Sequence, residues 1–396
     1  MIRANTTRQE VALVHCRRYD DEEVFRSVER AVDLIGGIGR YVRPGSRVLL
    51  KPNLLMGAGP ERAVTTHPAV VCAVARLLSA HGCEVVIADS PGAGTRYTRR
   101  NLEHAYEKAG FTAAAAYPRV RLSTDTSSRE VPCPDGTVMK RFSIINEALN
   151  ADAIVVVSKA KTHLFTTYSG AVKNLFGVVP GLEKPVFHAR FRQPERFAEM
   201  LLDLNTCVVP VLHVMDAVVG MEGDGPMSGS PRPIGAVLAA ADPTAVDIVT
   251  ARLMGMDPAT LPTINAAVGR GWVSPDFHEI EVVGDDAAAV TVPDFRHPST
   301  HPARPAVSFL NRQVLRFMQG RGTLTRPLPL PDPGRCTGCG RCVLTCPVNA
   351  IALEKGKAVV EGERCIRCYC CHEMCEEGAI DLKQGPLSRF VSRLLP

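Results

Sequence analysis

The cysteines of this 396-residue chain are concentrated in one short segment. Nine of the 14 lie between Cys336 and Cys375. Because thiolates are strong metal ligands, and because cysteine-dense segments in a reducing compartment bind metal more often than they form disulfides, the segment predicts metal binding. Eight of the nine form two runs in which successive cysteines are separated by two, two and three residues: Cys336, Cys339, Cys342 and Cys346, then Cys365, Cys368, Cys371 and Cys375.

The two cysteine runs are halves of an internal repeat. Each cysteine of the first run recurs 29 residues later, and Ala350-Ile351 recurs as Ala379-Ile380. With Pro347 after the first run, the segment resembles the bacterial two-cluster ferredoxins. That resemblance implies two 4Fe–4S clusters, in which the fourth cysteine of each run binds the other cluster. Cluster 1 would be held by Cys336, Cys339, Cys342 and Cys375, and cluster 2 by Cys365, Cys368, Cys371 and Cys346.

Two residues depart from the ferredoxin pattern. Glu376 stands where proline would follow the last cysteine, and Cys370 adds a thiol directly before Cys371. With Cys370 as a ligand the regular spacing would be lost, so we expect Cys371 to be the ligand. Structural zinc is the rival metal. It needs four ligands, usually from two separated Cys-x-x-Cys pairs, and fits two runs of four thiolates poorly.

Polar segments follow four of the strands expected in residues 1–300. They begin at Lys51, at Asp89, at Ser158 and at Asp216. Ligands of open α/β sheets bind outside the carboxyl ends of the strands, so we expect the four segments to converge on one crevice. The ligand-binding candidates are Lys51, Asn53, Asp89, Lys159, Lys173, Asn174 and Glu222, and the catalytic candidates are Lys161, His163 and Asp216.

The chemistry of these candidates favours an anionic ligand. Lysines suit a carboxylate or a phosphate. His163 could act as a general acid or base or as a metal ligand, and the carboxylates could take a proton or bind a further divalent cation. Each lysine taken singly is more simply explained as a solvated surface charge. The pair Lys161 and His163, two residues apart beyond a buried strand, is the more specific signal.

Three of these segments also carry a family resemblance. They are Lys51-Pro52-Asn53, the segment 159–177 with the motifs KAKTH and GAVKNLFG, and the segment 216–226 with MEGDGP. On these motifs the chain resembles the domain-of-unknown-function family 362 over about residues 10–290. Members of that family are often fused to ferredoxin modules. The resemblance implies an α/β architecture and names no reaction.

Apolar runs and helical periodicity predict alternating strands and helices in residues 1–300. This order indicates an α/β domain with a mainly parallel sheet and helices on both faces. We expect an amphipathic helix and a Pro-rich linker over 301–335, a small α+β two-cluster ferredoxin-like domain over 336–384, and an amphipathic tail over 385–396. The expected strands are 11–16, 47–50, 84–88, 153–158, 209–215, 235–240 and 279–283, and the expected helices are 20–41, 67–80, 194–205, 242–254 and 262–269.

Composition argues against several classes of protein. A net charge of +5 and an aromatic content of 5% do not favour nucleic-acid binding. No apolar run reaches the length of a transmembrane segment, and the first residues lack the apolar region of a signal peptide. We therefore expect a cytoplasmic protein, with the oligomeric state open.

We interpret the sequence as that of an iron–sulfur redox protein. Its ferredoxin module would carry electrons to or from an α/β domain that binds an anionic small molecule or cofactor, or to a redox partner protein. Two alternatives stay open: a non-redox, metal-dependent isomerase or lyase with structural or regulatory clusters, and a non-catalytic electron carrier. The sequence does not decide whether the protein is an enzyme.

Overall fold

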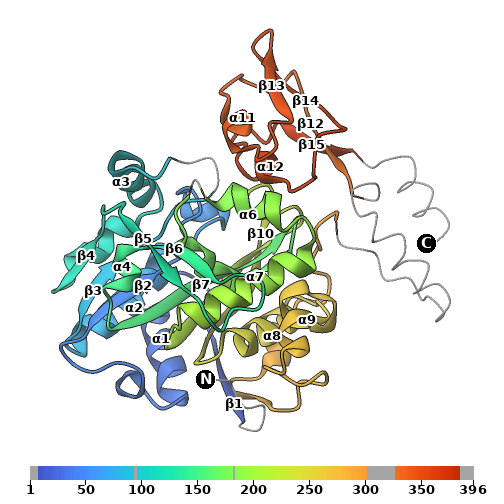
Figure 1. Ribbon diagram of the computed structural model, residues 1–396. Helices are drawn as coiled ribbons and strands as arrows, with labels where there is room; N and C mark the ends of the chain where they lie inside the picture. Colours follow the sequence, from blue (N-terminus) through green and yellow to red (C-terminus); the bar gives the residue numbers. More distant parts are fainter. Residues whose placement is uncertain (1–7, 93–95, 182, 301–325, 384–396) are drawn as a thin grey trace.

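A computed structural model describes residues 8–92, 96–181, 183–300 and 326–383. Its larger part is a sheet with helices on both faces, and a small module of short strands and helices lies above it in Figure 1. The expected amphipathic helix near 306–318 and the C-terminal tail lie outside the described residues. In the described part of the chain, no helix is long and apolar enough to cross a membrane.

Nine strands form the large sheet, in the order β11–β1–β10–β9–β7–β2–β3–β4 with β8 paired to β7. Neighbours are parallel except where β10 meets β1 and β9 and where β8 meets β7, so the sheet is mainly parallel, as predicted. Its strands are β1 (Gln9–His15), β2 (Arg47–Lys51), β3 (Glu84–Ile87), β4 (Val120–Leu122), β7 (Ala153–His163), β8 (Thr167–Ser169), β9 (Leu212–Glu222), β10 (Ser230–Ala240) and β11 (Ile280–Gly284). A separate hairpin is formed by β5 (Ser128–Pro132) and β6 (Arg141–Ile145).

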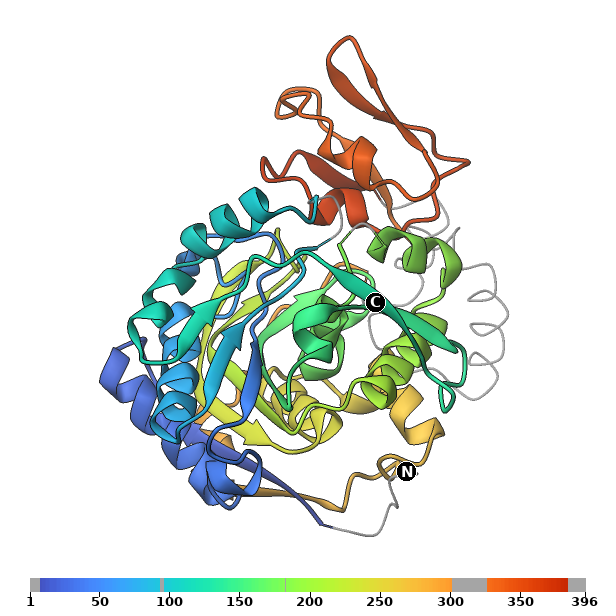
Figure 2. The same ribbon diagram turned by 60° about the vertical axis from the view of Figure 1, so that its left-hand side comes forward.

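Helices cover both faces of the sheet and enclose two hydrophobic cores (Figures 1 and 2). Side chains of β7 alternate between them: Val155 and Val157 pack in the core with α1, α2 and α3, and Ile154 and Val156 pack in the core with α5, α7, α8 and α9. The helices are α1 (Asp21–Leu34), α2 (Pro68–Ala80), α3 (Arg99–Lys108), α4 (Asn146–Leu149), α5 (Ala171–Asn174), α6 (Lys184–Arg190), α7 (Pro194–Cys207), α8 (Pro243–Leu253) and α9 (Pro262–Gly269).

The two central strands are longer than predicted. β7 continues to His163 and β9 to Glu222, so Lys159, Lys161, His163 and Asp216 belong to strands rather than to loops after them. The prediction ended each strand where its apolar run ended. That criterion was wrong here because the polar side chains of these strands are buried in the sheet, where each lysine finds an oxygen partner.

The small module contains two pairs of antiparallel strands and two short helices. β12 (Leu328–Pro331) pairs with β15 (Ile380–Lys383), and β13 (Ile351–Glu354) pairs with β14 (Lys357–Val360). The helices are α11 (Arg341–Thr345) and α12 (Cys370–Glu373). Leu328–Pro331, which we expected in the linker, is thus a strand of the module. Its prolines are tolerated because a strand paired on one side needs only some of its N–H groups.

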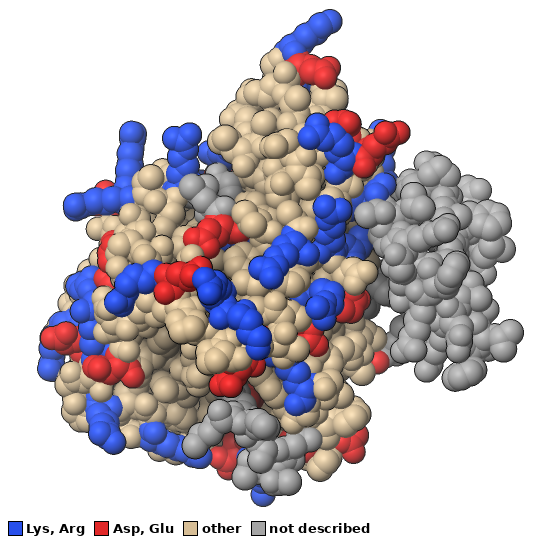
Figure 3. All heavy atoms as spheres, in the orientation of Figure 1, with Lys and Arg blue, Asp and Glu red and all other residues tan. Residues whose placement is uncertain are grey.

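Charged side chains of both signs are interspersed on the face of the molecule shown in Figure 3. The buried charges are more informative, because lysines are almost never fully buried without a partner. Lys51, Lys159 and Lys161 are each at most 2% exposed, and all three lie in the strands at the centre of the sheet.

Candidate functional site

A small cavity of about 60 Å³ lies at the carboxyl ends of β2, β3 and β7. The loop after β2 contributes Asn53, the loop after β3 contributes Asp89 and Ser90, and β7 contributes Lys161. This is the position that the sequence predicts for a ligand of a parallel sheet. Further lining residues are Leu55, Gly92, Ser169, Lys173, Asn174, Phe176, Gly177, Lys184, His188, Pro226 and Glu373.

Asp89, in one wall of the cavity, forms a buried ion pair with Lys51. Lys51 Nζ lies 3.0 Å from Asp89 Oδ1 and donates a hydrogen bond to Asn174 Oδ1 at 3.1 Å. The backbone N–H of Leu54 donates to the other oxygen of Asp89 at 2.9 Å. A Cβ atom on Gly177 would stand 1.9 Å from Asp89 Oδ1, so only glycine fits beside the pair.

Lys161 and Lys173 supply positive charge to the cavity. Lys161 Nζ donates to Asn53 Oδ1 at 2.6 Å and to the Val64 carbonyl at 2.8 Å, and neither partner carries a formal charge. Burial, reinforced by the neighbouring Lys173 ammonium, lowers the pKa of Lys161 well below its usual range. Burial also lowers the pKa of Lys173. An anion placed between the two side chains would stabilise the charged form of each lysine.

His163, at the end of β7, is fully buried and neutral. Its Nδ1 accepts hydrogen bonds from the backbone N–H groups of Phe165 at 3.0 Å and Thr166 at 3.4 Å, so the ring proton is on Nε2. Burial lowers the pKa of His163 well below its usual range. Its Nε2 lies 3.2 Å from Oε1 of Glu373.

Glu373 comes from α12 of the small module and reaches into the cavity of the large domain. Its side chain is buried, and burial raises the pKa of its carboxyl group to about 7 against the opposing effect of Lys173 and Lys161. The sequence analysis did not select this residue. The sequence does contain a signal for it. In the internal repeat, Glu373 is equivalent to Leu344 of the first half, so the acidic residue occurs in one half only.

Two residues of α6 were also missed. Lys184 is buried and donates to the carbonyls of Ser90 at 2.5 Å and Pro91 at 2.8 Å, and burial lowers its pKa to about 7. His188, on the same helix, is buried and stacks on Phe197 with ring centroids 4.5 Å apart. α6 turns this histidine inward, where it lines the cavity. Burial lowers the pKa of His188 to about 3.

Several buried polar atoms around the cavity have no hydrogen-bond partner within the described ranges. They are Asp89 Oδ1, Ser90 Oγ, His188 Nδ1, His163 Nε2 and Glu373 Oε1. The first lies in its ion pair with Lys51, and the last two are close but poorly aligned with each other. An unpartnered buried polar atom costs about 1–3 kcal/mol, so a cluster of them around one cavity is typical of a site completed by a ligand or water.

Five of the predicted site residues do not line the cavity. Lys51 and His163 lie next to it, where they contact the lining residues Asp89 and Glu373. Lys159 pairs with Asp216 at 2.9 Å, and the hydroxyl group of Tyr19 donates to Asp216 at 2.8 Å, so these residues form a separate buried network. Glu222 pairs with Arg296 at 2.8 Å. The expected convergence of all four segments is therefore only partly correct, since the fourth segment contributes Pro226 rather than Asp216 or Glu222.

The structure brings the cysteines of the first predicted set together. Cys336, Cys339, Cys342 and Cys375 line one small cavity within the module. The repeated alanines explain part of this arrangement: the N–H of Ala350 donates to Cys346 Sγ at 3.1 Å, and that of Ala379 donates to Cys375 Sγ at 3.2 Å. Donors aimed at sulfur favour thiolates, so the donor set fits a cluster.

The second predicted set is also close together. Burial raises the pKa of Cys371 well above its usual range, and the neighbouring Cys368, Cys365, Cys342 and Cys346 add to this effect. Cys370 instead turns toward the large domain: it is fully buried, packs with Cys368 in a small cluster that Ala189 of α6 contacts, and lies near Lys173.

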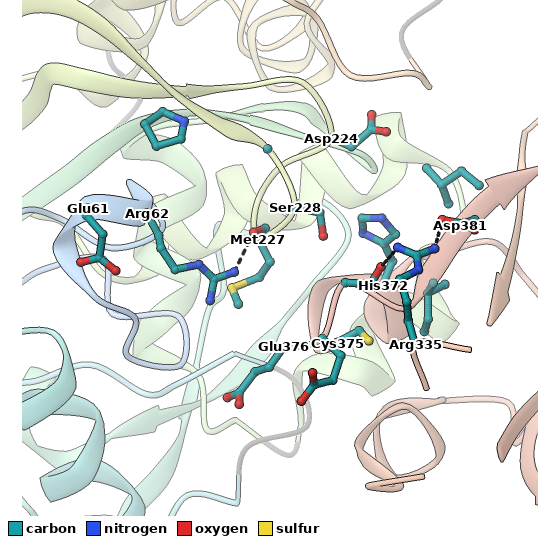
Figure 4. A pocket seen from close by; sticks show the side chains of 16 residues that line it. Glu61, Arg62, Asp224, Met227, Ser228, Arg335, His372, Cys375, Glu376 and Asp381 are labelled. Atoms are coloured by element: carbon teal, nitrogen blue, oxygen red, sulfur yellow. Dashed lines mark hydrogen bonds and ion pairs between the residues drawn. The ribbon is translucent and has the colours of Figure 1, made fainter. Parts of the chain in front are cut away.

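On another side of α12 the module and the large domain enclose an open cleft of about 610 Å³. In Figure 4, Glu61, Arg62 and Met227 of the large domain face His372 and Cys375 of the module. Because Cys375 belongs to the first cysteine set, this cleft gives solvent access to that set. Glu376, which replaces the expected proline, lines the cleft and pairs with Arg341 at 2.5 Å.

Comparison with known proteins supports both parts of this description. Residues 48–252 match the family described as a domain of unknown function, DUF362, and residues 329–352 match the 4Fe–4S binding domain. The thylakoid-associated protein sll1697 of Synechocystis is 34% identical over 276 residues, which cover 68% of this chain and 82% of that protein. Ferredoxin-1 of Rhodobacter capsulatus is 44% identical over 43 residues, which are 11% of this chain and 66% of the ferredoxin.

Among solved structures, the lactate racemase apoprotein of Thermoanaerobacterium thermosaccharolyticum is similar with a TM-score of 0.36 and 13% sequence identity. The match covers 61% of this chain and 56% of the racemase chain, so the chain spans little more than half of that relative. The family match and the cysteine-rich module together establish that the chain belongs to the DUF362 family and is an iron–sulfur protein with a C-terminal 4Fe–4S binding domain.

Proposed function

We propose that this protein is a cytoplasmic iron–sulfur oxidoreductase with two 4Fe–4S clusters, held by the two cysteine sets described above. The cavity at the carboxyl ends of β2, β3 and β7, which we call the crevice, would bind a small anion. The module would exchange electrons with that ligand and with a redox partner protein. The observation that carries the proposal is the position of α12, which places Glu373 in the crevice while its neighbours Cys371 and Cys375 belong to the two cysteine sets.

The charges around the cavity support an anionic ligand. Lys51 is paired with Asp89, which leaves Lys161, Lys173 and Lys184 facing a single carboxylate, that of Glu373. A buried charge without a counter-charge is costly, so a ligand that brings negative charge would stabilise the lysines in their charged forms. A volume of about 60 Å³ admits a group of a few non-hydrogen atoms, such as a carboxylate or a phosphate.

The position of each cysteine set supports a route for electron transfer. A 4Fe–4S cluster gives or takes one electron at a time. The loop with Cys368 and Cys370 packs on α6 of the large domain, so the second set is the one next to the crevice. Cys339 of the first set is exposed and Cys375 lines the open cleft, so a redox partner would approach there.

The test uses the full chain, purified without oxygen. The proposal expects about eight iron and eight sulfide per chain, together with saturable binding of inorganic phosphate that Lys173→Gln weakens without loss of iron. Zinc in place of iron would contradict the cofactor assignment. Failure of phosphate, acetate and formate to bind would favour the non-catalytic electron carrier. Anion binding that is insensitive to reduction, with turnover that needs no electrons, would favour an isomerase or lyase with structural clusters.

A further inference from the structure

Glu373 occupies the part of the cavity in which a ligand anion is expected. Its side chain lies beside His163 Nε2 and lines the cavity together with Lys161 and Lys173. Its carboxylate raises the pKa of both lysines, against the effect of burial. The cavity of about 60 Å³ has room for a few atoms beside Glu373, but the Glu373 carboxylate would repel a second anion close to those two lysines as long as it stays in place.

The internal repeat shows that the cluster-binding fold does not require this carboxylate. The equivalent residue of the first half is Leu344, which is 67% exposed, whereas Glu373 is 6% exposed. The halves differ in the same way at Tyr369, which is buried and donates to the Pro327 carbonyl at 3.0 Å, against Gly340 in the first half. Glu373 and Tyr369, which pack against the large domain, therefore both come from the second half of the repeat.

We propose that Glu373 is an internal anion of the crevice, and that the crevice ligand binds by replacing it. This inference rests on the anion site of the proposed function. Without ligand, the carboxylate of Glu373 partly neutralises the buried lysines. When a small carboxylate or phosphate enters, its oxygens take over that role, and the side chain of Glu373 withdraws toward the module.

The replacement would be transmitted to the cysteines through a very short segment. Glu373 is the last residue of α12, two residues after Cys371 and two residues before Cys375. Its backbone N–H donates to the Tyr369 carbonyl at 2.9 Å, and that of Met374 donates to the Cys370 carbonyl at 3.2 Å. Withdrawal of Glu373 changes the conformation of this turn. It therefore changes the surroundings of Cys371, a predicted ligand of cluster 2, and of Cys375, a predicted ligand of cluster 1. Occupation of the crevice is thereby coupled to the module.

The first test compares phosphate binding by the anaerobically purified full chain and its Glu373→Gln variant. Removal of the internal anion should tighten phosphate binding by about tenfold or more, the range for a hydrogen bond to a charged group. Glu373→Asp, which keeps the charge, should bind phosphate nearly as weakly as the unaltered chain. Glu354→Gln is the matched control, because Glu354 is exposed on the same module and lines neither the cavity, the open cleft nor the cavity of the first cysteine set.

The outcomes separate this inference from the function on which it rests. If no chain binds phosphate, including Glu373→Gln, the anion site itself is refuted. If the unaltered chain binds phosphate and Glu373→Gln binds it no more tightly, the anion site stands and the replacement is refuted.

A second test needs no variant. Hydrogen exchange of the backbone amides in residues 371–375 should become faster when phosphate saturates the unaltered chain, because the turn after α12 loses its anchor in the crevice. Unchanged exchange in this segment at saturating phosphate would contradict the replacement even if Glu373→Gln lost its clusters.

Discussion

The imidazole of His163 and the carboxylate of Glu373 meet across the boundary between the large domain and the cysteine-rich module, with Nε2 and Oε1 3.2 Å apart. Both side chains are buried, and the proton of the imidazole is fixed on the nitrogen that faces the carboxylate. The crevice is therefore completed by the module. The segment that carries Glu373 also carries cysteines of both sets, so the cavity and the module share one short stretch of chain.

The first prediction concerns Lys161. Lys161→Met keeps the apolar stem but removes the ammonium group, and we expect phosphate to bind more weakly by about 1.5–3 kcal/mol, the range for hydrogen bonds to charged groups. Titration calorimetry on the full chain would measure this. Lys108→Met, on the exposed side of α3, is the control and should leave the affinity unchanged. Equal affinity in the Lys161 variant would remove this residue from the site.

The second prediction is a pH dependence that comes from Lys184. Its pKa is lowered to about 7 by burial, against Asp89, which raises it, and with Lys51 and Lys173, which lower it further. Lys184 is charged below that pKa and neutral above it, so phosphate affinity should fall as the pH rises through about 7. Phosphate affinity should be measured on the Glu373→Gln variant, because this variant lacks the carboxyl group of Glu373, the other nearby group with a pKa of about 7. Addition of Lys184→Arg should flatten the profile, and an equally steep profile would show that another group is responsible.

The third prediction separates folding from ligand binding at Asp216. Asp216→Asn removes the counter-charge of the fully buried Lys159, and loss of one partner from such a pair typically costs about 3–5 kcal/mol. Denaturant unfolding should show this loss of stability, while phosphate affinity at low temperature stays unchanged. If stability were kept and phosphate binding lost, Asp216 would be the functional residue that its sequence position suggested.

The fourth prediction concerns cluster ligands. Cys370→Ser should keep both clusters, because this thiol faces α6, whereas Cys371→Ser and Cys346→Ser should each perturb cluster 2. Iron analysis and paramagnetic resonance of the reduced chain distinguish these results. Loss of a whole cluster in Cys370→Ser would reverse the assignment of Cys370 and Cys371, and a disturbance of cluster 1 alone in Cys346→Ser would refute the crossed ligand pairing.

The sequence predicts those parts of this molecule that depend on local spacing. The regular cysteine runs and the alternating strands and helices could be recognised because ligand geometry and hydrophobic periodicity repeat over short distances. The crevice could be predicted only in part. Lys161 follows an apolar run within β7 and was found, whereas Lys184, His188 and Glu373 reach the cavity because of tertiary packing alone.

The strand ends and the strand order could not be predicted from the sequence, for a related reason. Lys159 and Asp216 look like loop residues because they are charged, and only their mutual pairing inside the sheet makes burial acceptable. The order of strands depends on contacts between segments that are distant in the sequence. Hydrophobic periodicity gives no information about such contacts. The difference between Glu373 and Leu344, which are equivalent in the repeat, was the one local signal that this side of the module contacts the large domain.

The most direct test of the account is a redox titration of the anaerobically purified full chain with and without saturating phosphate, followed by paramagnetic resonance. If crevice and clusters are coupled, the midpoint potential of at least one cluster shifts when phosphate binds. A coupling of about 1 kcal/mol corresponds to roughly 40 mV for one electron. Identical potentials for both clusters, measured while calorimetry shows phosphate bound, would contradict the claim that this crevice and this module work as one redox site.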